Sequence, residues 1–152
     1  DTTSKINFVE KQYKTEFVLC DFNLEKKMYK SRLGDLVIDC EGGDIDRHAE
    51  FWAGALGRTV EAEPKNPRYR RLIGTEDEIG ILLQSVEHPS RVHLDIETDD
   101  PEKEVARLEG LGATIVQKLD GWTVMQATSG HRFCVVKPQL AGFEEAAKTW
   151  EA

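Results

Sequence analysis

Along residues 33–137, apolar residues either alternate with polar ones or recur at helical spacing, in an order that occurs twice. The first copy predicts a strand in "LGDLVIDC" (33–40), then a helix that begins after Asp44 and stops at Gly57. The second copy predicts a strand in "RVHLDIET" (91–98), then a helix with Pro101 at its first position. Three further strands follow each helix, and we expect them at residues 58–63, 69–73, 79–86, 113–119, 121–127 and 131–137. The pattern therefore predicts a βαβββ unit written twice.

Two such units predict an α+β fold. A single unit exposes a sheet face that it cannot cover alone. We therefore expect the tandem modules, about residues 33–87 and 91–138, to form a curved, half-open mixed β-sheet around a cavity, with the helices on the outside. The chain outside these modules is expected to contribute an N-terminal extension (1–32), left unassigned, and a C-terminal amphipathic helix (139–152) that docks through Trp150.

The second-module strand "RVHLDIET" places residues of different character on its two faces. Its apolar residues are expected to pack against the helix, so that Leu94→Asp would unfold the chain by burying an unpaired charge. Its other face would then point into the cavity, and His93→Ala would leave the fold intact. The apolar face comprises Val92, Leu94 and Ile96, and the polar face comprises His93, Asp95 and Glu97. On the first strand, Asp35, Val37 and Asp39 share the corresponding face.

Composition narrows the class of protein. The 152 residues are 39% hydrophobic and carry a formal net charge of −8, which favours one globular domain and disfavours nucleic acid and anionic membranes as partners. No run of 18 apolar residues predicts a membrane span. Three cysteines without a CxxC motif fit a reduced, cytoplasmic setting better than a disulfide framework.

Three stretches carry a resemblance to a known family: "LVIDCEGGDIDRHAEFWAGALGRTV", "SRVHLDIETDDPEKEVARLEGLGATIV" and "GWTVMQATSGHRFCVVKP". Over residues 33–138 the chain resembles the vicinal oxygen chelate superfamily, in its glyoxalase-like, bleomycin-resistance-like branch. The closing segment keeps that branch's turn glycine and Phe-Cys pair but lacks its Asp-Pro. The resemblance implies the same fold, but it leaves function open, because the superfamily includes metal-dependent lyases, isomerases and dioxygenases as well as proteins that only bind a drug.

The resemblance also implies four positions at which metal-using members place their ligands. They correspond here to Asp35, Leu82 (with Gln84 two residues on), His93 and Cys134. Only His93 is of the expected ligand type, and Leu82 cannot ligate. His93, Asp35 and Cys134 could together hold zinc. The alternative is that all of these residues simply line a cavity.

Other candidates have two interpretations each. His93 is either a general base or part of an inert hydrogen-bonded cluster. The acidic side chains Asp39, Asp95 and Glu97 form either a rim for a cationic ligand or ordinary solvated charges. Trp122 either stacks on a flat ligand or caps the core, and "RYRR" (68–71) is either an anion contact or a solvated strand edge.

These observations lead to a small-molecule-binding protein of the glyoxalase-like type, possessing at most a minor activity, and expected to form a homodimer. Its ligand-binding residues are predicted to be Asp35, Leu82, Gln84, His93, Trp122 and Cys134. One alternative is a lyase or isomerase that anchors a divalent metal ion through His93 and Asp35. A second is a non-catalytic structural or regulatory module. The cofactor is accordingly either none or a divalent metal ion.

Overall fold

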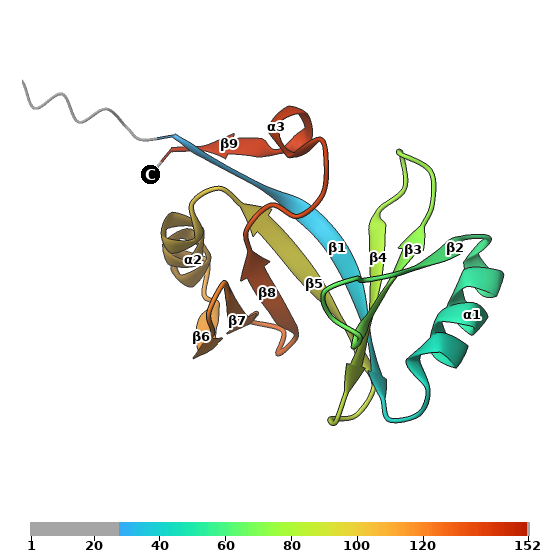
Figure 1. Cartoon of the computed structure of the whole chain (residues 1–152). Helices are drawn as coiled ribbons and strands as arrows, with labels where there is room; N and C mark the ends of the chain where they lie inside the picture. The colour runs from blue at the N-terminus through green and yellow to red at the C-terminus, as the bar shows by residue number, and fades with distance from the viewer. Residues whose placement is uncertain (1–27, 152) are drawn as a thin grey trace, which may run out of the picture.

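The computed structural model describes residues 28–151 and arranges them as one curved, mixed sheet with two longer helices on its outside (Figure 1). The first module runs through β1 (Tyr29–Glu41), α1 (Ile45–Leu56), β2 (Thr59–Ala62), β3 (Tyr69–Ile73) and β4 (Gly80–Val86). The second module runs through β5 (Arg91–Thr98), α2 (Pro101–Gly110), β6 (Thr114–Lys118), β7 (Trp122–Gln126) and β8 (Arg132–Val136). A short helix α3 (Phe143–Ala146) and strand β9 (Lys148–Trp150) follow. The predicted α+β fold class is confirmed.

The strand order shows that the two modules are related by an internal twofold. The main sheet runs β2-β3-β4-β1-β5-β8-β7-β6, so each module presents its first strand to the other. These two strands pair antiparallel, whereas β1 pairs parallel with β4 and β5 pairs parallel with β8. In the first module Val37 lies beside Leu82, and in the second Asp95 lies beside Cys134. Leu82 and Cys134 therefore occupy equivalent places in the two halves.

The predicted helix boundaries follow from local chemistry. The Asp44 carboxylate accepts a hydrogen bond from the Asp46 backbone N–H at the start of α1, and Gly57 ends that helix in the left-handed conformation at φ 68°. Asp100 caps α2 by accepting from the Lys103 backbone N–H. These caps fix where each helix begins and where α1 ends.

Two hydrophobic cores lie between the helices and the sheet, one in each module. The first is formed by Ile38, Cys40, Ala49, Ala53, Leu72, Ile81 and Leu83. The second is formed by Val105, Leu108, Met125, Phe133 and Val135. Because the apolar side chains of β1, β4 and β8 are used here, the polar side chains that alternate with them face the concave side.

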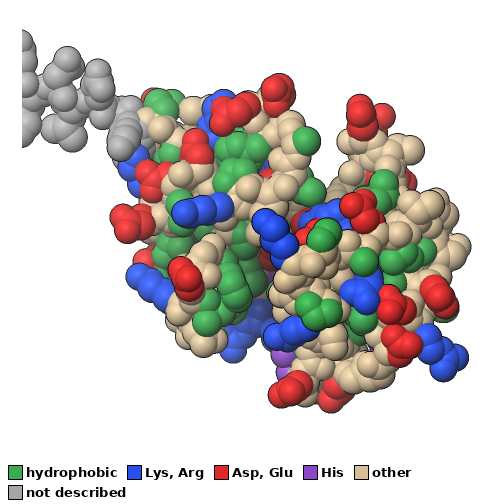
Figure 2. All heavy atoms as spheres, viewed as in Figure 1, with side chains coloured by type: hydrophobic (Ala, Val, Ile, Leu, Met, Phe, Trp, Pro, Cys, Tyr) green, Lys and Arg blue, Asp and Glu red, His purple; other side chains and the backbone are tan. Residues whose placement is uncertain are grey.

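One predicted face is wrong in part. Ile96 packs against the second core, but Val92 and Leu94 are 52% and 41% exposed. The physical reason is that α2 packs over β6 and β8 and leaves the N-terminal half of β5 uncovered. Leu94→Asp would therefore not bury a charge. The uncovered residues border an apolar groove beside Leu108 and Leu111, and Figure 2 shows hydrophobic side chains gathered over this half of the molecule.

The ends of the chain also differ from the prediction. Residues 29–32 belong to β1, while residues 1–27 of the predicted extension lie outside the described part. At the C-terminal end, only one helical turn forms in place of a helix over 139–152, because Ala147 is extended and Lys148–Trp150 pairs with the start of β1. Trp150 does dock, since its indole N–H donates to Ser31 Oγ at 2.7 Å and the Arg107 guanidinium lies 4.0 Å from its ring. In the described residues, no helix has the length and apolar character that crossing a bilayer requires.

Candidate functional site

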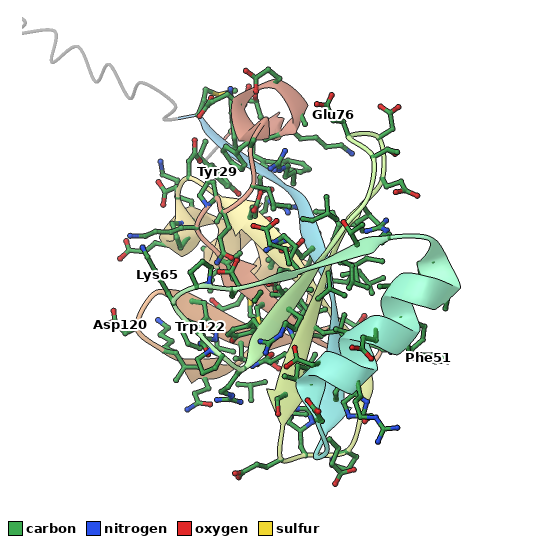
Figure 3. The ribbon with its side chains drawn as sticks, turned by 45° about the vertical axis from the view of Figure 1, so that its right-hand side comes forward. Tyr29, Phe51, Lys65, Glu76, Asp120 and Trp122 are labelled. Atoms are coloured by element: carbon green, nitrogen blue, oxygen red, sulfur yellow. The ribbon has the colours of Figure 1, made fainter. Side chains whose placement is uncertain are left out.

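The concave face of the sheet holds a pocket of about 300 Å³ that both modules line. Five of the six side chains predicted to form a ligand site line it: Leu82, Gln84, His93, Trp122 and Cys134. The loop between β2 and β3 contributes Glu63 and Asn66 to the same lining as Trp122, and Figure 3 labels Trp122 and, in that loop, Lys65. The pocket is therefore built from β1, β3, β4, β5, β7 and β8 together.

His93 is the polar centre of this pocket. Its side chain is 9% exposed and its Nδ1–H donates to Asp39 Oδ2 at 2.9 Å, so the ring is fixed with Nε2 toward Asp95, at 3.5 Å from Oδ1. Asp39 is itself 1% exposed and lies on the neighbouring strand β1. The alternation of β1 and β5 thus brings together two carboxylates and an imidazole that are far apart in sequence.

The surroundings of His93 determine its charge. Burial by itself would lower its pKa, but the hydrogen bond to Asp39 and the polar contacts with Asp95 and Cys134 outweigh burial and raise the pKa to about 11. Asp39 responds in the opposite sense: burial opposes ionisation, yet the hydrogen bond and charge of His93 hold the pKa of Asp39 below its ordinary value. At neutral pH the pair is an imidazolium and a carboxylate. His93 is therefore a hydrogen-bond donor at neutral pH and acts as a base only after losing its proton.

The structure gathers one group of possible metal ligands from the described residues: His93, Asp95 and Cys134, whose donor atoms lie within 4.8 Å of one another. Nitrogen, carboxylate oxygen and thiolate sulfur together form a donor set that suits zinc. Asp95 Oδ1 is buried and lies 3.5 Å from His93 Nε2, too far for a well-formed hydrogen bond, which leaves it able to accept from a bound group or to ligate. The residues fit a zinc-type ion if the His93 and Cys134 protons are displaced.

Asp35 takes a different role from the predicted one. Its carboxylate is held by Arg71 of β3, which donates from Nη1 at 2.8 Å and from Nη2 at 3.2 Å. Asp35 is 2% exposed and does not line the pocket, whereas Arg71 does. The group of possible ligands therefore contains Asp95 in place of the predicted Asp35.

The acidic residues of β1 and β5 are not solvated charges. Asp39, Asp95 and Glu97 are all buried. Glu97 accepts from Arg32 Nε at 2.9 Å and from the backbone N–H groups of Gln139 and Leu140 at 2.8 and 3.0 Å. It fixes the segment after β8, and Gln139 of that segment lines the pocket.

The predicted ligand site lacks several of the lining residues, among them Tyr69 and Arg71 of the "RYRR" stretch. The alternation of "RYRR" continues into β3 and places both residues on one face. The sequence therefore indicated that they share a face, but it did not show which strand β3 pairs with. Burial raises the pKa of Tyr69, which keeps its phenol neutral. Tyr69 and Trp122 give the pocket two aromatic side chains.

The comparisons with known proteins bear on this geometry. A family model described as a glyoxalase-like domain matches residues 35–136. The chain belongs to the glyoxalase-like domain family. It is thereby a member of the vicinal oxygen chelate superfamily, as the sequence resemblance predicted. No curated protein matches this glyoxalase-like chain significantly in sequence.

Solved structures show the same fold at low identity. The methylmalonyl-CoA epimerase from Mycobacterium tuberculosis is 16% identical, with a TM-score of 0.53 over 71% of this chain and 88% of its own. A hypothetical protein from Bacillus halodurans C-125 is 12% identical, with a TM-score of 0.54 over 74% and 97%. A variant of homoprotocatechuate 2,3-dioxygenase from B. fuscum is 14% identical, with a TM-score of 0.51, and this chain covers only 33% of it. These likenesses establish the fold alone.

Proposed function

We propose that this glyoxalase-like protein binds a flat small organic molecule in the concave pocket, with His93 and Asp95 orienting its polar group. One observation carries the proposal: a buried carboxylate oxygen, Asp95 Oδ1, borders the pocket, and its contact with His93 Nε2, at 3.5 Å, is too long for a well-formed hydrogen bond. A buried acceptor of this kind costs free energy unless a bound group satisfies it.

The surrounding side chains define the chemistry of the ligand. Asp95 accepts from an N–H or O–H group, while the protonated His93 beside it favours an electron-rich atom. Tyr69 and Trp122 supply aromatic surface for a ring. The four ligand positions implied by the family offer little support for a metal requirement here, since Leu82 has no donor atom and Asp35 is held by Arg71.

A pair of matched probes tests the proposal. We expect 2-naphthol to raise the melting temperature of the protein more than 2-methoxynaphthalene, which lacks the donor, because a ligand that binds only the native state stabilises it. Asp95→Ala should weaken 2-naphthol binding by about tenfold or more, as expected for a hydrogen bond to a charged group. Asp77→Ala, an exposed loop substitution, is the matched control. Failure of both compounds, and of a wider set of aromatic donors, to raise the melting temperature would favour a non-catalytic module with no ligand.

A second function is supported by the grouping of His93, Asp95 and Cys134. In a metal-dependent lyase or isomerase these three side chains would hold a zinc-type ion, which supplies a Lewis acid for a substrate carbonyl. Metal analysis of protein purified without chelator distinguishes this function from the first. A stoichiometric ion that is lost in both Asp95→Ala and Cys134→Ser, but retained in Asp77→Ala, would support it.

A further inference from the structure

We infer that the pocket opens into a basic vestibule that binds the anionic group of the ligand, so that the ligand class is a flat organic acid. This inference rests on the proposed function of the same pocket. A second cavity, of about 920 Å³, shares Gln84, His93, Trp122 and Cys134 with the first, so the two lie next to each other. We call its outer part the vestibule and define it by Arg68, His88, Arg91 and Arg132.

The charges of the vestibule contrast with those of the whole chain. The formal net charge of the chain is −8, yet three arginines meet here against two carboxylates, Asp39 and Glu87. The charge of Asp39 is already paired within the protein, because Asp39 is buried and accepts hydrogen bonds from both His93 and Arg91. Three arginines against Asp39 and Glu87 leave these groups with a net charge of +1. Such a concave positive region attracts anions in a protein that otherwise repels them.

The arginines also keep donors available. In the described part of the chain, the half-buried Arg132 guanidinium makes neither a hydrogen bond nor an ion pair, and it lies at the rim shared with the apolar groove. Arg68 uses Nε and Nη2 on the Ser85 carbonyl, at 3.2 and 2.9 Å, which leaves Nη1 free of any hydrogen bond to the described residues. Guanidinium groups with open N–H donors favour carboxylates, sulfonates and phosphates.

Strand geometry sets the length of the ligand. Cys134 lies beside Asp95 in the β5–β8 ladder, and Arg132 precedes Cys134 by two residues on the same face of β8. Two residues of a strand span roughly 7 Å. A ligand that reaches both Asp95 and Arg132 thus carries its N–H or O–H donor and its anionic group at opposite ends of a ring system of one or two rings.

Inorganic anions test the vestibule independently of the pocket. At constant ionic strength, millimolar pyrophosphate should raise the melting temperature above that in chloride, and both Arg132→Gln and Arg68→Gln should reduce the rise. Arg47→Gln, on the exposed side of α1, is the matched control and should keep it. If pyrophosphate has no more effect than chloride, or if the variants respond like the wild type, the vestibule proposal is overturned while the pocket proposal stands on its own test.

A pair of organic probes then tests whether vestibule and pocket act on one ligand. We expect 6-hydroxy-2-naphthoate to bind about tenfold or more tightly than its uncharged amide, since one charge-assisted contact is worth about that factor. Arg132→Gln should remove this preference and leave amide binding unchanged. Equal binding of the acid and the amide to the wild-type protein would overturn the acid specificity alone. If Asp95→Ala then weakened binding of both compounds, the ring would still be shown to bind in the pocket.

Discussion

His93 illustrates how burial and hydrogen bonding act against each other on a single side chain. Its imidazole is almost fully buried, but Asp39 at 2.9 Å and Asp95 at 3.5 Å favour the charged form. An unpaired buried histidine would be neutral. The two neighbouring carboxylates are therefore the reason why this site presents a proton to the pocket.

The charge of His93 predicts how stability depends on pH. A group whose pKa is higher in the folded state stabilises the fold fully below its ordinary pKa, here 6.5, and loses that contribution as the pH rises toward about 11. The free energy of unfolding should therefore fall between pH 6.5 and 9, by at most about 1.4 kcal/mol per pH unit from this residue. Asp39, with its lowered pKa, contributes above 3.8 and loses its contribution on acidification.

Urea unfolding at pH 6, 7.5 and 9 measures this dependence. We expect His93→Gln to show a smaller decline than the wild type, because Gln has no titrating group. His131→Gln, on the exposed turn before β8, serves as the control and should decline like the wild type. Equal declines in wild type and His93→Gln would show that the imidazole is not held protonated.

Gly34 provides a prediction that depends on the space around a buried carboxylate. A Cβ at this position would lie 2.6 Å from Cγ of Glu97, whose carboxylate holds Arg32 and the segment after β8. Gly34→Ala should therefore destabilise the protein by about 1–3 kcal/mol, as overpacking in a filled site does. Gly54→Ala, in an open part of α1, should leave stability unchanged or raise it, and chemical denaturation of both variants makes the comparison.

For single residues, the sequence indicated which side chains face the cavity more readily than which side chains they pair with. Alternation placed His93, and the family resemblance placed Cys134, in the cavity, where the structure has them. It did not reveal that Arg71 holds Asp35, because that pair joins strands whose neighbourhood depends on the sheet order. Charged residues on a cavity face can be assigned from periodicity, but their pairing depends on tertiary contacts.

At the scale of elements, β5 and α2 show why the alternation of a strand predicted more burial of its apolar residues than the structure has. All three apolar residues of "RVHLDIET" share one face, yet α2 covers only Ile96. The helix has ten residues and so extends only about 15 Å, and its contacts lie over β6 and β8. Periodicity gives the face of a strand but not the reach of the helix that packs on it.

This difference predicts opposite outcomes for two similar substitutions. Leu94→Asp places a charge at a position that is 41% exposed and should change the free energy of unfolding by less than about 1 kcal/mol. Val135→Asp buries a charge in the second core, where the side chain is 0% exposed, and should prevent folding. Circular dichroism with thermal melting separates the two. If Leu94→Asp were to unfold the chain, the N-terminal half of β5 would have to be buried in solution.

At the scale of the whole molecule, the two modules join through β1 and β5 within one chain, and both line the pocket. The strand repeat predicted two like modules around a cavity, but it left open whether each module pairs with the other or with a second chain. The homodimer expected from the sequence stays a prediction. Its test is separate from that of the pocket, since no second copy is needed to complete the lining that is described here.

The single-chain pocket leads to a prediction about stoichiometry. Titration with 6-hydroxy-2-naphthoate should give one site per chain, with an affinity that stays constant over a hundredfold range of protein concentration, because Leu82 and Gln84 of one module face His93 and Cys134 of the other without a partner. Light scattering over the same range reports the oligomeric state independently. An affinity that rises in step with dimer formation would show that the second copy contributes to the site, and the ligand would then bind at an interface between chains.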